Sequence, residues 1–100
     1  MPAAITMVRV YLTESDKLLH QVVSTLHDVE SVRGVTVFRG ISGFGQSGEI
    51  HSASLLDLST DLPVVVEFFD EPGKVEKIVA HLNNIVESDH IVSWPAQLNP

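Results

Sequence analysis

The chain contains no cysteine among its 100 residues, which excludes disulfide bonds, thiol chemistry and zinc sites with cysteine ligands. Positive charge is also scarce, because six lysines and arginines stand against thirteen acidic residues and give a net charge of −7. Such a charge disfavours binding to nucleic acid and to anionic membrane surfaces. No apolar run reaches the roughly 20 residues that cross a bilayer, so we expect no direct membrane insertion.

Sequence motifs for catalysis are absent as well. The chain has neither a Gly-x-Ser-x-Gly turn, which exposes a catalytic serine, nor a Gly-x-x-x-x-Gly-Lys-Ser/Thr phosphate loop. No basic segment followed by an apolar stretch stands near the first residue, so we expect no signal peptide and a cytoplasmic location. We therefore expect a non-enzymatic protein that folds as a single domain over residues 1–100.

Hydrophobic residues make up 44% of the chain, and their spacing predicts six elements. Alternating apolar positions are typical of strands, whereas apolar residues three and four positions apart are typical of helices. The resulting order, β-α-β-β-α-β, predicts an α+β, ferredoxin-like fold with both helices on one face of an antiparallel sheet. The first and third strands are then neighbours in the centre. The predicted strands are residues 5–12, 34–41, 63–69 and 90–94, and the predicted helices are residues 18–29 and 72–86.

Two residues are expected to set the ends of these elements. Gly34 is predicted to end the first helix, because glycine accepts the left-handed backbone that closes many helices. Pro95 is predicted to place the last strand at a sheet edge or to stop it, because proline cannot donate a ladder hydrogen bond.

The sheet face away from the helices is also predicted to be apolar. This open face carries Met7, Tyr11, Val65 and Phe69, with Arg9 and Glu67 among them on adjacent strands. We expect these two charged residues to pair across the sheet. A large apolar face rimmed by polar groups usually marks an interface, so we expect an oligomer. A monomer with scattered exposed apolar residues is the alternative.

The connection from residue 42 to residue 61 is too long for a hairpin turn. Connections of this length in compact domains are usually functional or disordered. Three glycines stand in its first part, and three leucines stand in its second part. We expect part of it to pack on a neighbour or to extend the hairpin, and a floppy surface loop is the alternative.

Several segments resemble the PII-like superfamily, in an uncharacterised branch similar to the nitrogen regulatory PII proteins. They are Val8-Arg9-Val10-Tyr11-Leu12, Arg39-Gly40-Ile41-Ser42-Gly43-Phe44-Gly45 and Asp61-Leu62-Pro63-Val64. The resemblance covers nearly the whole chain. It implies a homotrimer whose open faces turn towards a central axis, with small-molecule pockets in the clefts between subunits. It also implies that the 42–61 connection docks on a target protein, such as a membrane transporter or an enzyme.

The same resemblance implies where a nucleotide would bind. The adenine would lie around Thr36 and Glu67, and the phosphates would lie beside the Gly-Phe-Gly segment, whose backbone N–H groups are accessible to anions. Arg39 is the best cation near the connection, either as a phosphate contact or as a structural strand arginine. The nucleotide-binding candidates are Thr36, Arg39, Gly43, Phe44, Gly45 and Glu67, and the candidates for contact with a partner or effector are Gln46 and His51.

Two departures from the PII pattern bear on the ligand. Gln46-Ser47 stands where PII proteins have Arg-Gln, and the link before the last strand is Glu87-Ser88-Asp89 instead of a segment rich in glycine and lysine. Two carboxylates would repel the three phosphates of ATP. AMP, ADP, another small effector or no ligand therefore stay open.

Two other functions are alternatives. A metal-binding trimer of the ion-tolerance type would use His51, Glu49 and Asp57. A small acylphosphatase-like enzyme would share the topology only, since that activity needs an arginine-bearing loop where this chain has Thr13-Glu14-Ser15-Asp16. The spacing of the other histidines indicates solvated side chains at His20 and His27.

The remaining two histidines, His81 and His90, have no partner that spacing alone predicts.

Overall fold

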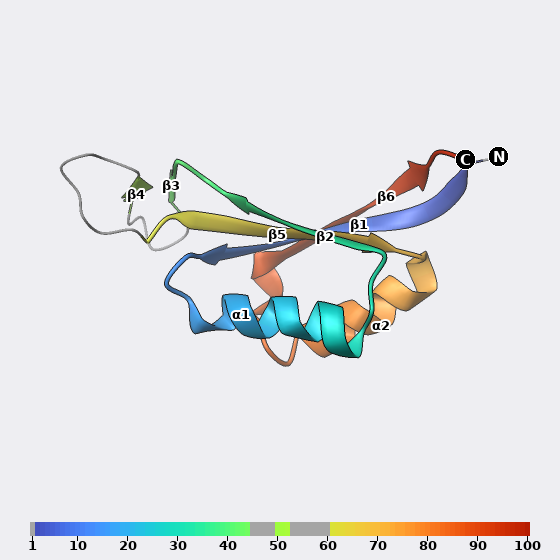
Figure 1. The fold of residues 1–100 in the computed structure, drawn as a ribbon, viewed down its shortest axis with the longest axis horizontal. Helices are drawn as coiled ribbons and strands as arrows, with labels where there is room; N and C mark the ends of the chain where they lie inside the picture. Colours follow the sequence, from blue (N-terminus) through green and yellow to red (C-terminus); the bar gives the residue numbers. More distant parts are fainter. Residues whose placement is uncertain (1, 45–49, 53–60) are drawn as a thin grey trace.

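A computed structural model of the protein describes residues 2–44, 50–52 and 61–100. Its main sheet is antiparallel, and both helices lie on one face of it (Figure 1). The strand order β2-β5-β1-β6 places the first and third predicted strands side by side in the centre. The predicted α+β, ferredoxin-like fold is therefore confirmed. The strands of this sheet are β1 (Ala3–Thr13), β2 (Gly34–Arg39), β5 (Pro63–Asp70) and β6 (Ile91–Leu98).

The core lies between the sheet and two helices, α1 (Lys17–Ser24) and α2 (Pro72–Leu82). Alternate residues of β1 and β5 point into it, because successive strand residues face opposite sides of a sheet. They meet the apolar stripes of the helices, as the periodicity predicts. Fully buried side chains from the strands and the helical segments are Val8, Val10, Val66, Phe68, Val22, Leu26, Ile78 and Leu82.

The first helical segment begins at a side-chain cap and reaches the predicted end at Val29, but its last turn is not α-helical. The Asp16 carboxylate accepts a hydrogen bond from the backbone N–H of Leu18 at 2.9 Å, which satisfies a free N–H group of the first turn. After Ser24 the chain continues through a π-helical turn, η1 (Thr25–Val29). The left-handed residue that follows is Ser31, with φ 50°.

The prediction that Gly34 ends this helix is therefore wrong. Gly34 is the first residue of β2, paired with Phe69 of β5. A Cβ atom at this position would lie 3.1 Å from Cε1 of Phe69, so close packing against the ring favours glycine there.

The end of the chain also differs from the predicted bounds. Helix α2 ends at Leu82, yet Val86 beyond it is still buried against the core. A short 3-10 helix, η2 (Ser88–His90), leads into β6, which runs through Pro95 to Leu98 instead of stopping at residue 94. Among the described residues, strand β6 pairs with β1 alone and lies at the sheet edge, as Pro95 predicts.

The connection between β2 and β5 contains a small antiparallel pair, β3 (Ser42–Phe44) and β4 (Ile50–Ser52). This pair forms a two-stranded sheet of its own and does not lengthen the ladder between β2 and β5, so it does not confirm that the connection extends the hairpin. Strand β2 ends at Arg39 and not at residue 41. Gly40 still donates a hydrogen bond from its N–H to the carbonyl oxygen of Pro63 at 2.7 Å, but Pro63 has no N–H to return one. The three leucines of the connection lie outside the described residues. No helix in the described part of the chain is long and apolar enough to cross a membrane.

Candidate functional site

A cavity of about 690 Å³ lies where β1 ends and β5 begins. Its walls come from residues 11–13 of β1, residues 42–44 of β3, residues 63–65 of β5 and the link before β6. This volume is in the range of small-molecule sites, roughly 300–1,000 Å³. The described lining residues include Asp16, Asp89 and His90, but no lysine or arginine. The cavity is thus large enough for a nucleotide-sized ligand, and its charged lining is acidic.

Two glycines at the cavity bring β3 close to β5. A Cβ atom at Gly40 would lie 2.8 Å from Cγ of Pro63, and one at Gly43 would lie 3.2 Å from the same atom. Contacts under 3.0 Å do not occur between real Cβ atoms and a rigid ring, so Gly40 is fixed by packing. These glycines set the shape of the cavity wall, which a larger residue would displace.

The open face of the sheet carries the predicted ion pair at its centre. Arg9 Nε donates a hydrogen bond to Glu67 Oε2 at 2.7 Å, which confirms the cross-strand pair. The same guanidinium lies over the Trp94 ring, 5.6 Å from its centroid, as in a cation–π contact. The Glu67 carboxylate, by accepting that bond, raises the pKa of Arg9 above its ordinary value.

Apolar side chains surround this pair on the open face. The sheet register adds Thr36 and Phe38 of β2, and Val92 and Trp94 of β6, to the residues predicted from β1 and β5. The exposed fractions of the large ones are 44% for Tyr11, 47% for Phe38, 46% for Val92 and 36% for Trp94. Tyr11 and Val65 belong to this face and also line the cavity, so the two features form one continuous surface.

The structure brings some of the predicted nucleotide-binding residues together and separates others. Gly43 and Phe44 line the cavity. Thr36 and Glu67 are direct register partners, but they lie on the open face and do not line the cavity. Within the described chain the Glu67 carboxylate is bound to Arg9. These two residues would therefore meet a ligand in the cavity only if it extended along the open face.

Arg39 lies in a different place from the cavity lining. Its guanidinium donates to the carboxylate of Glu14, just after β1, in an ion pair between the ends of β2 and β1. This contact fits the structural alternative for Arg39. Gly45 and Gln46 lie outside the described residues, as do Glu49 and Asp57. The backbone of His51 pairs with Gly43 in the β3–β4 ladder.

Two histidines have partners that spacing did not predict. His81 Nδ1 lies 2.8 Å from Glu30 Oε1, and His90 Nδ1 lies 3.0 Å from the carbonyl oxygen of Tyr11. Both partners lie far from these histidines in the sequence, so residue spacing does not reveal them. The antiparallel pairing of β6 with β1 carries the missing signal for His90, because Ile91 pairs with Val10 and so brings His90 next to Tyr11.

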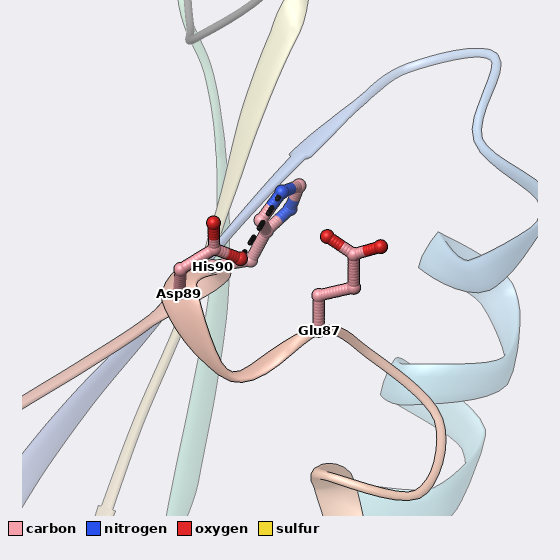
Figure 2. Close-up of side chains that lie close together, drawn as sticks. All are labelled: Glu87, Asp89 and His90. Atoms are coloured by element: carbon pink, nitrogen blue, oxygen red, sulfur yellow. Dashed lines mark ion pairs between the residues drawn. The ribbon is translucent and has the colours of Figure 1, made fainter.

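His90 also belongs to a cluster that the sequence analysis missed. One ligand atom from each of Glu87, Asp89 and His90 lies within 4.8 Å of the others, on the link between α2 and β6 (Figure 2). In the sequence this link was read only as an acidic segment that would repel phosphate. The position of its side chains beside one another depends on the turn of η2, which residue spacing does not specify.

A family model and curated relatives match the chain. The model DUF190, described as Uncharacterized ACR, matches residues 5–98. A UPF0166 protein of Aquifex aeolicus is 41% identical over 51 residues, which cover 51% of this chain and 49% of that protein. The matched region thus spans about half the length of this relative. A UPF0166 protein of Methanocaldococcus jannaschii is 26% identical over 90 residues, covering 86% of this chain and 82% of that protein.

Solved structures share the fold at low identity. CPII from Thiomonas intermedia K12, bound to ADP and bicarbonate, matches with a TM-score of 0.75 and 17% identity, covering 100% of this chain and 93% of that chain. The divalent ion tolerance protein CutA1 from Ehrlichia chaffeensis matches with a TM-score of 0.62 and 12% identity, covering 100% of this chain and 85% of that chain. These matches confirm the PII-like fold that the sequence segments indicated.

Proposed function

We propose that this chain, which belongs to the DUF190 family, is a PII-like regulatory protein and not an enzyme. It forms a homotrimer of single-domain subunits that binds AMP or ADP in the clefts between them. The observation that carries this proposal is the continuity of the cavity with the open face through Tyr11 and Val65. A subunit seated on the open face would cover apolar surface and would also become a wall of the cavity.

Assembly through the open face has a simple physical reason. Tyr11, Phe38, Val92 and Trp94 expose a third to a half of their surface on the side of the sheet that the helices do not cover. Contiguous exposed apolar surface of this kind is unfavourable in water and is usually covered by a partner. Closed rotational symmetry allows identical chains to share the same face without leaving an edge uncovered.

The effector class follows from the cavity and from the structural neighbours. CPII, which shares the fold, was solved with ADP and bicarbonate. Asp16 and Asp89 in the lining repel each added phosphate, so AMP and ADP are favoured over ATP. Thr36 and Glu67 remain the residues proposed to hold adenine where the ligand reaches the open face, and Gly43 and Phe44 adjoin the phosphates.

Regulation would then operate through the connection between β2 and β5. Its first residues, Ser42 to Phe44, form part of the cavity wall, so a bound ligand touches the base of the segment. A ligand shifts the populations of a segment's alternative conformations by the difference in its affinity for them. We propose that nucleotide binding selects one state of the 42–61 connection and thereby changes its affinity for a target protein.

Calorimetric titration of the purified chain with AMP, ADP and ATP tests the nucleotide assignment. We expect AMP or ADP to bind more tightly than ATP and to be recovered unchanged. Ligand at about 100 times its Kd should stabilise the fold by roughly 2.7 kcal/mol in thermal unfolding. Absence of binding by all three nucleotides at millimolar concentration contradicts the proposal.

Two matched variants locate the binding residues. Glu67→Gln removes the open-face carboxylate while keeping its shape, and we expect weaker binding of AMP and ADP. Glu76→Gln removes an exposed carboxylate from α2 and should leave the affinity unchanged. The oligomer mass is measured for both variants, so that a loss of assembly is distinguished from a loss of ligand contact. Equal affinities in Glu67→Gln and the unsubstituted chain would remove Glu67 from the site.

A further inference from the structure

We propose that Glu87, Asp89 and His90 form a binding site for a divalent metal ion of the zinc type at the wall of the cavity. Their three ligand atoms lie within 4.8 Å of one another, and all three side chains reach solvent (Figure 2). The proposal does not rest on the proposed regulatory function. It rests on the orientation of the histidine, the lack of other partners for the carboxylates and the charge of the cavity.

The orientation of His90 is set from outside the cluster. Its Nδ1 atom lies 3.0 Å from the carbonyl oxygen of Tyr11 in β1. A carbonyl oxygen only accepts hydrogen bonds, so Nδ1 carries the proton and Nε2 of the neutral ring keeps its lone pair. Histidines that bind metals are commonly oriented in this way, with the other ring nitrogen bonded to a backbone carbonyl. The hydrogen bond to Tyr11 of β1 thus leaves Nε2 of His90 available to bind a metal ion.

The two carboxylates have no competing role among the described residues. Glu87 precedes η2, but its side chain makes no capping hydrogen bond and no ion pair there. Asp89 Oδ1 lies 3.8 Å from His90 Nε2, which is too long for a hydrogen bond. Within the cluster the structure thus has one ion-pair contact, between Asp89 and His90, and no contact of hydrogen-bond length (Figure 2).

The donor set and its spacing indicate the class of ion. One imidazole nitrogen with two carboxylate oxygens suits Zn²⁺ and similar divalent ions, because purely oxygen sites suit Mg²⁺ or Ca²⁺. Zinc bonds of roughly 2.0–2.2 Å require ligand atoms about 3.3 Å apart. The side chain of Asp89 is about half exposed, at 51%, and that of Glu87 is exposed, so both carboxylates have room to rotate towards Nε2 of His90.

A bound ion would also change the cavity. Asp89 and His90 line it, together with Asp16, and the described lining residues contain no lysine or arginine. A dication at this wall would offset the negative charge and, with three protein ligands, would keep a coordination position for water or for an anionic ligand. The acidic link would then attract an anion through the bound ion.

Calorimetric titration of the nucleotide-free full chain with ZnCl₂ tests this site. We expect one Zn²⁺ per chain, with affinity weakened at least about tenfold in Glu87→Gln and in Asp89→Asn, and about 100-fold in the double variant. His90→Asn is a third variant, because its amide still has a donor for Tyr11 but lacks Nε2. Far-ultraviolet circular dichroism checks that each variant is folded, and Glu87→Gln carries the test if the others are not.

Two control variants separate this site from other zinc ligands. His27 and Asp28 form another pair of neighbouring residues, with Nδ1 and Oδ1 2.7 Å apart. Asp28→Asn removes the carboxylate of this pair and should leave the affinity for Zn²⁺ unchanged. His51→Ala tests the alternative ligand in the connection and should also have no effect. The proposal is overturned by a lack of binding at millimolar Zn²⁺ or by full affinity in Glu87→Gln. It is equally overturned if Asp28→Asn or His51→Ala weakens binding as much as Glu87→Gln does.

The outcome is independent of the nucleotide experiment. Zinc is titrated without nucleotide, so failure of zinc binding leaves the proposed nucleotide site untouched. Failure of nucleotide binding likewise leaves the zinc result interpretable, because the variants at Glu87 and Asp89 are read out with the metal alone.

Discussion

The two faces of the central sheet are built from the same kinds of residues but have different surroundings. Along β5, Val64, Val66 and Phe68 are buried beneath the helices, whereas Val65 and Phe69 on the open face are only partly covered. The alternation of β-branched and aromatic residues therefore creates two apolar faces. The chain's own helices cover one of them, and the other stays partly exposed in the single chain. This difference is the basis for our proposal that assembly and ligand binding use the open face, whereas folding depends on the helix face.

Phe68 and Phe38 give the sharpest test of this comparison, because they are the same residue type on opposite faces. Phe68 is fully buried, and Phe68→Ala should lower the free energy of unfolding by about 3–5 kcal/mol through lost contacts and a residual cavity. Urea denaturation measures this loss. A loss below that of the matched variant Phe38→Ala would break the assignment of the core to the helix face.

Asp70 is the buried carboxylate of the helix face, and it predicts a dependence of stability on pH. Burial acts to raise the pKa of this group, but hydrogen bonds from the Glu71 backbone and the Lys74 side chain outweigh burial and lower the pKa below 3.8. A lowered pKa in the folded state stabilises the fold above the unfolded-state pKa, and this stability is lost as the pH falls through the folded value. We expect the loss below about pH 4.

The variant Asp70→Asn tests that contribution. It removes the charge that Lys74 Nζ contacts at 3.0 Å, and should destabilise the fold by about 1–3 kcal/mol at pH 7. Denaturation at a series of pH values should show a smaller loss of stability in acid for this variant. An identical acid profile in both proteins would mean that other carboxylates cause the loss.

Gly40 tests the packing at the end of the sheet where the open face meets the cavity. Gly40→Ala should lower the free energy of unfolding by about 1–3 kcal/mol, because the new Cβ would lie 2.8 Å from Pro63. Gly73→Ala in α2 is the matched control, since nothing lies within 4 Å of its Cβ position. We expect Gly73→Ala to stabilise the helix by roughly 0.5–1 kcal/mol. Thermal unfolding of both variants measures these changes. An unchanged stability of Gly40→Ala would contradict the close packing of Gly40 on Pro63.

Phe38→Ala has the smallest expected effect on the subunit and acts on assembly. In separated chains we expect a loss of stability well below that of Phe68→Ala, because Phe38 is already half exposed. At assembling concentrations, its melting temperature should fall more steeply on dilution than that of the unsubstituted protein. Thermal unfolding at several protein concentrations measures this, and no concentration dependence in either protein would count against assembly through the open face.

Much of the fold follows from the sequence because local periodicity determines it. The alternation in β1 and β5 specifies which residues face the helices, and the order of elements specifies that these strands are neighbours. Once they are antiparallel neighbours, the Arg9–Glu67 pair follows directly. Contacts made by turns are less predictable. The left-handed residue is Ser31 and not Gly34. Glycine at position 34 is explained by its close packing on Phe69 and not by closure of the helix.

The candidate site was predicted less completely, because it too depends on contacts made by turns. Gly43 and Phe44 were assigned to the ligand region from a resemblance, and they do line the cavity. The cluster of Glu87, Asp89 and His90 depends on how η2 turns the chain back beside the end of β1. No spacing in the sequence specifies that turn. The sequence therefore shows that the link is acidic, but not that its two carboxylates lie beside the His90 side chain.

Sedimentation equilibrium of the purified protein tests the central claim most directly. We predict a mass of three times 10.9 kDa, which shifts towards the single chain when Phe38 is replaced by aspartate on the open face. A mass of 10.9 kDa for the unsubstituted protein at every concentration would contradict this account, since the open face would then be exposed to water and the cavity would have no wall from a second subunit.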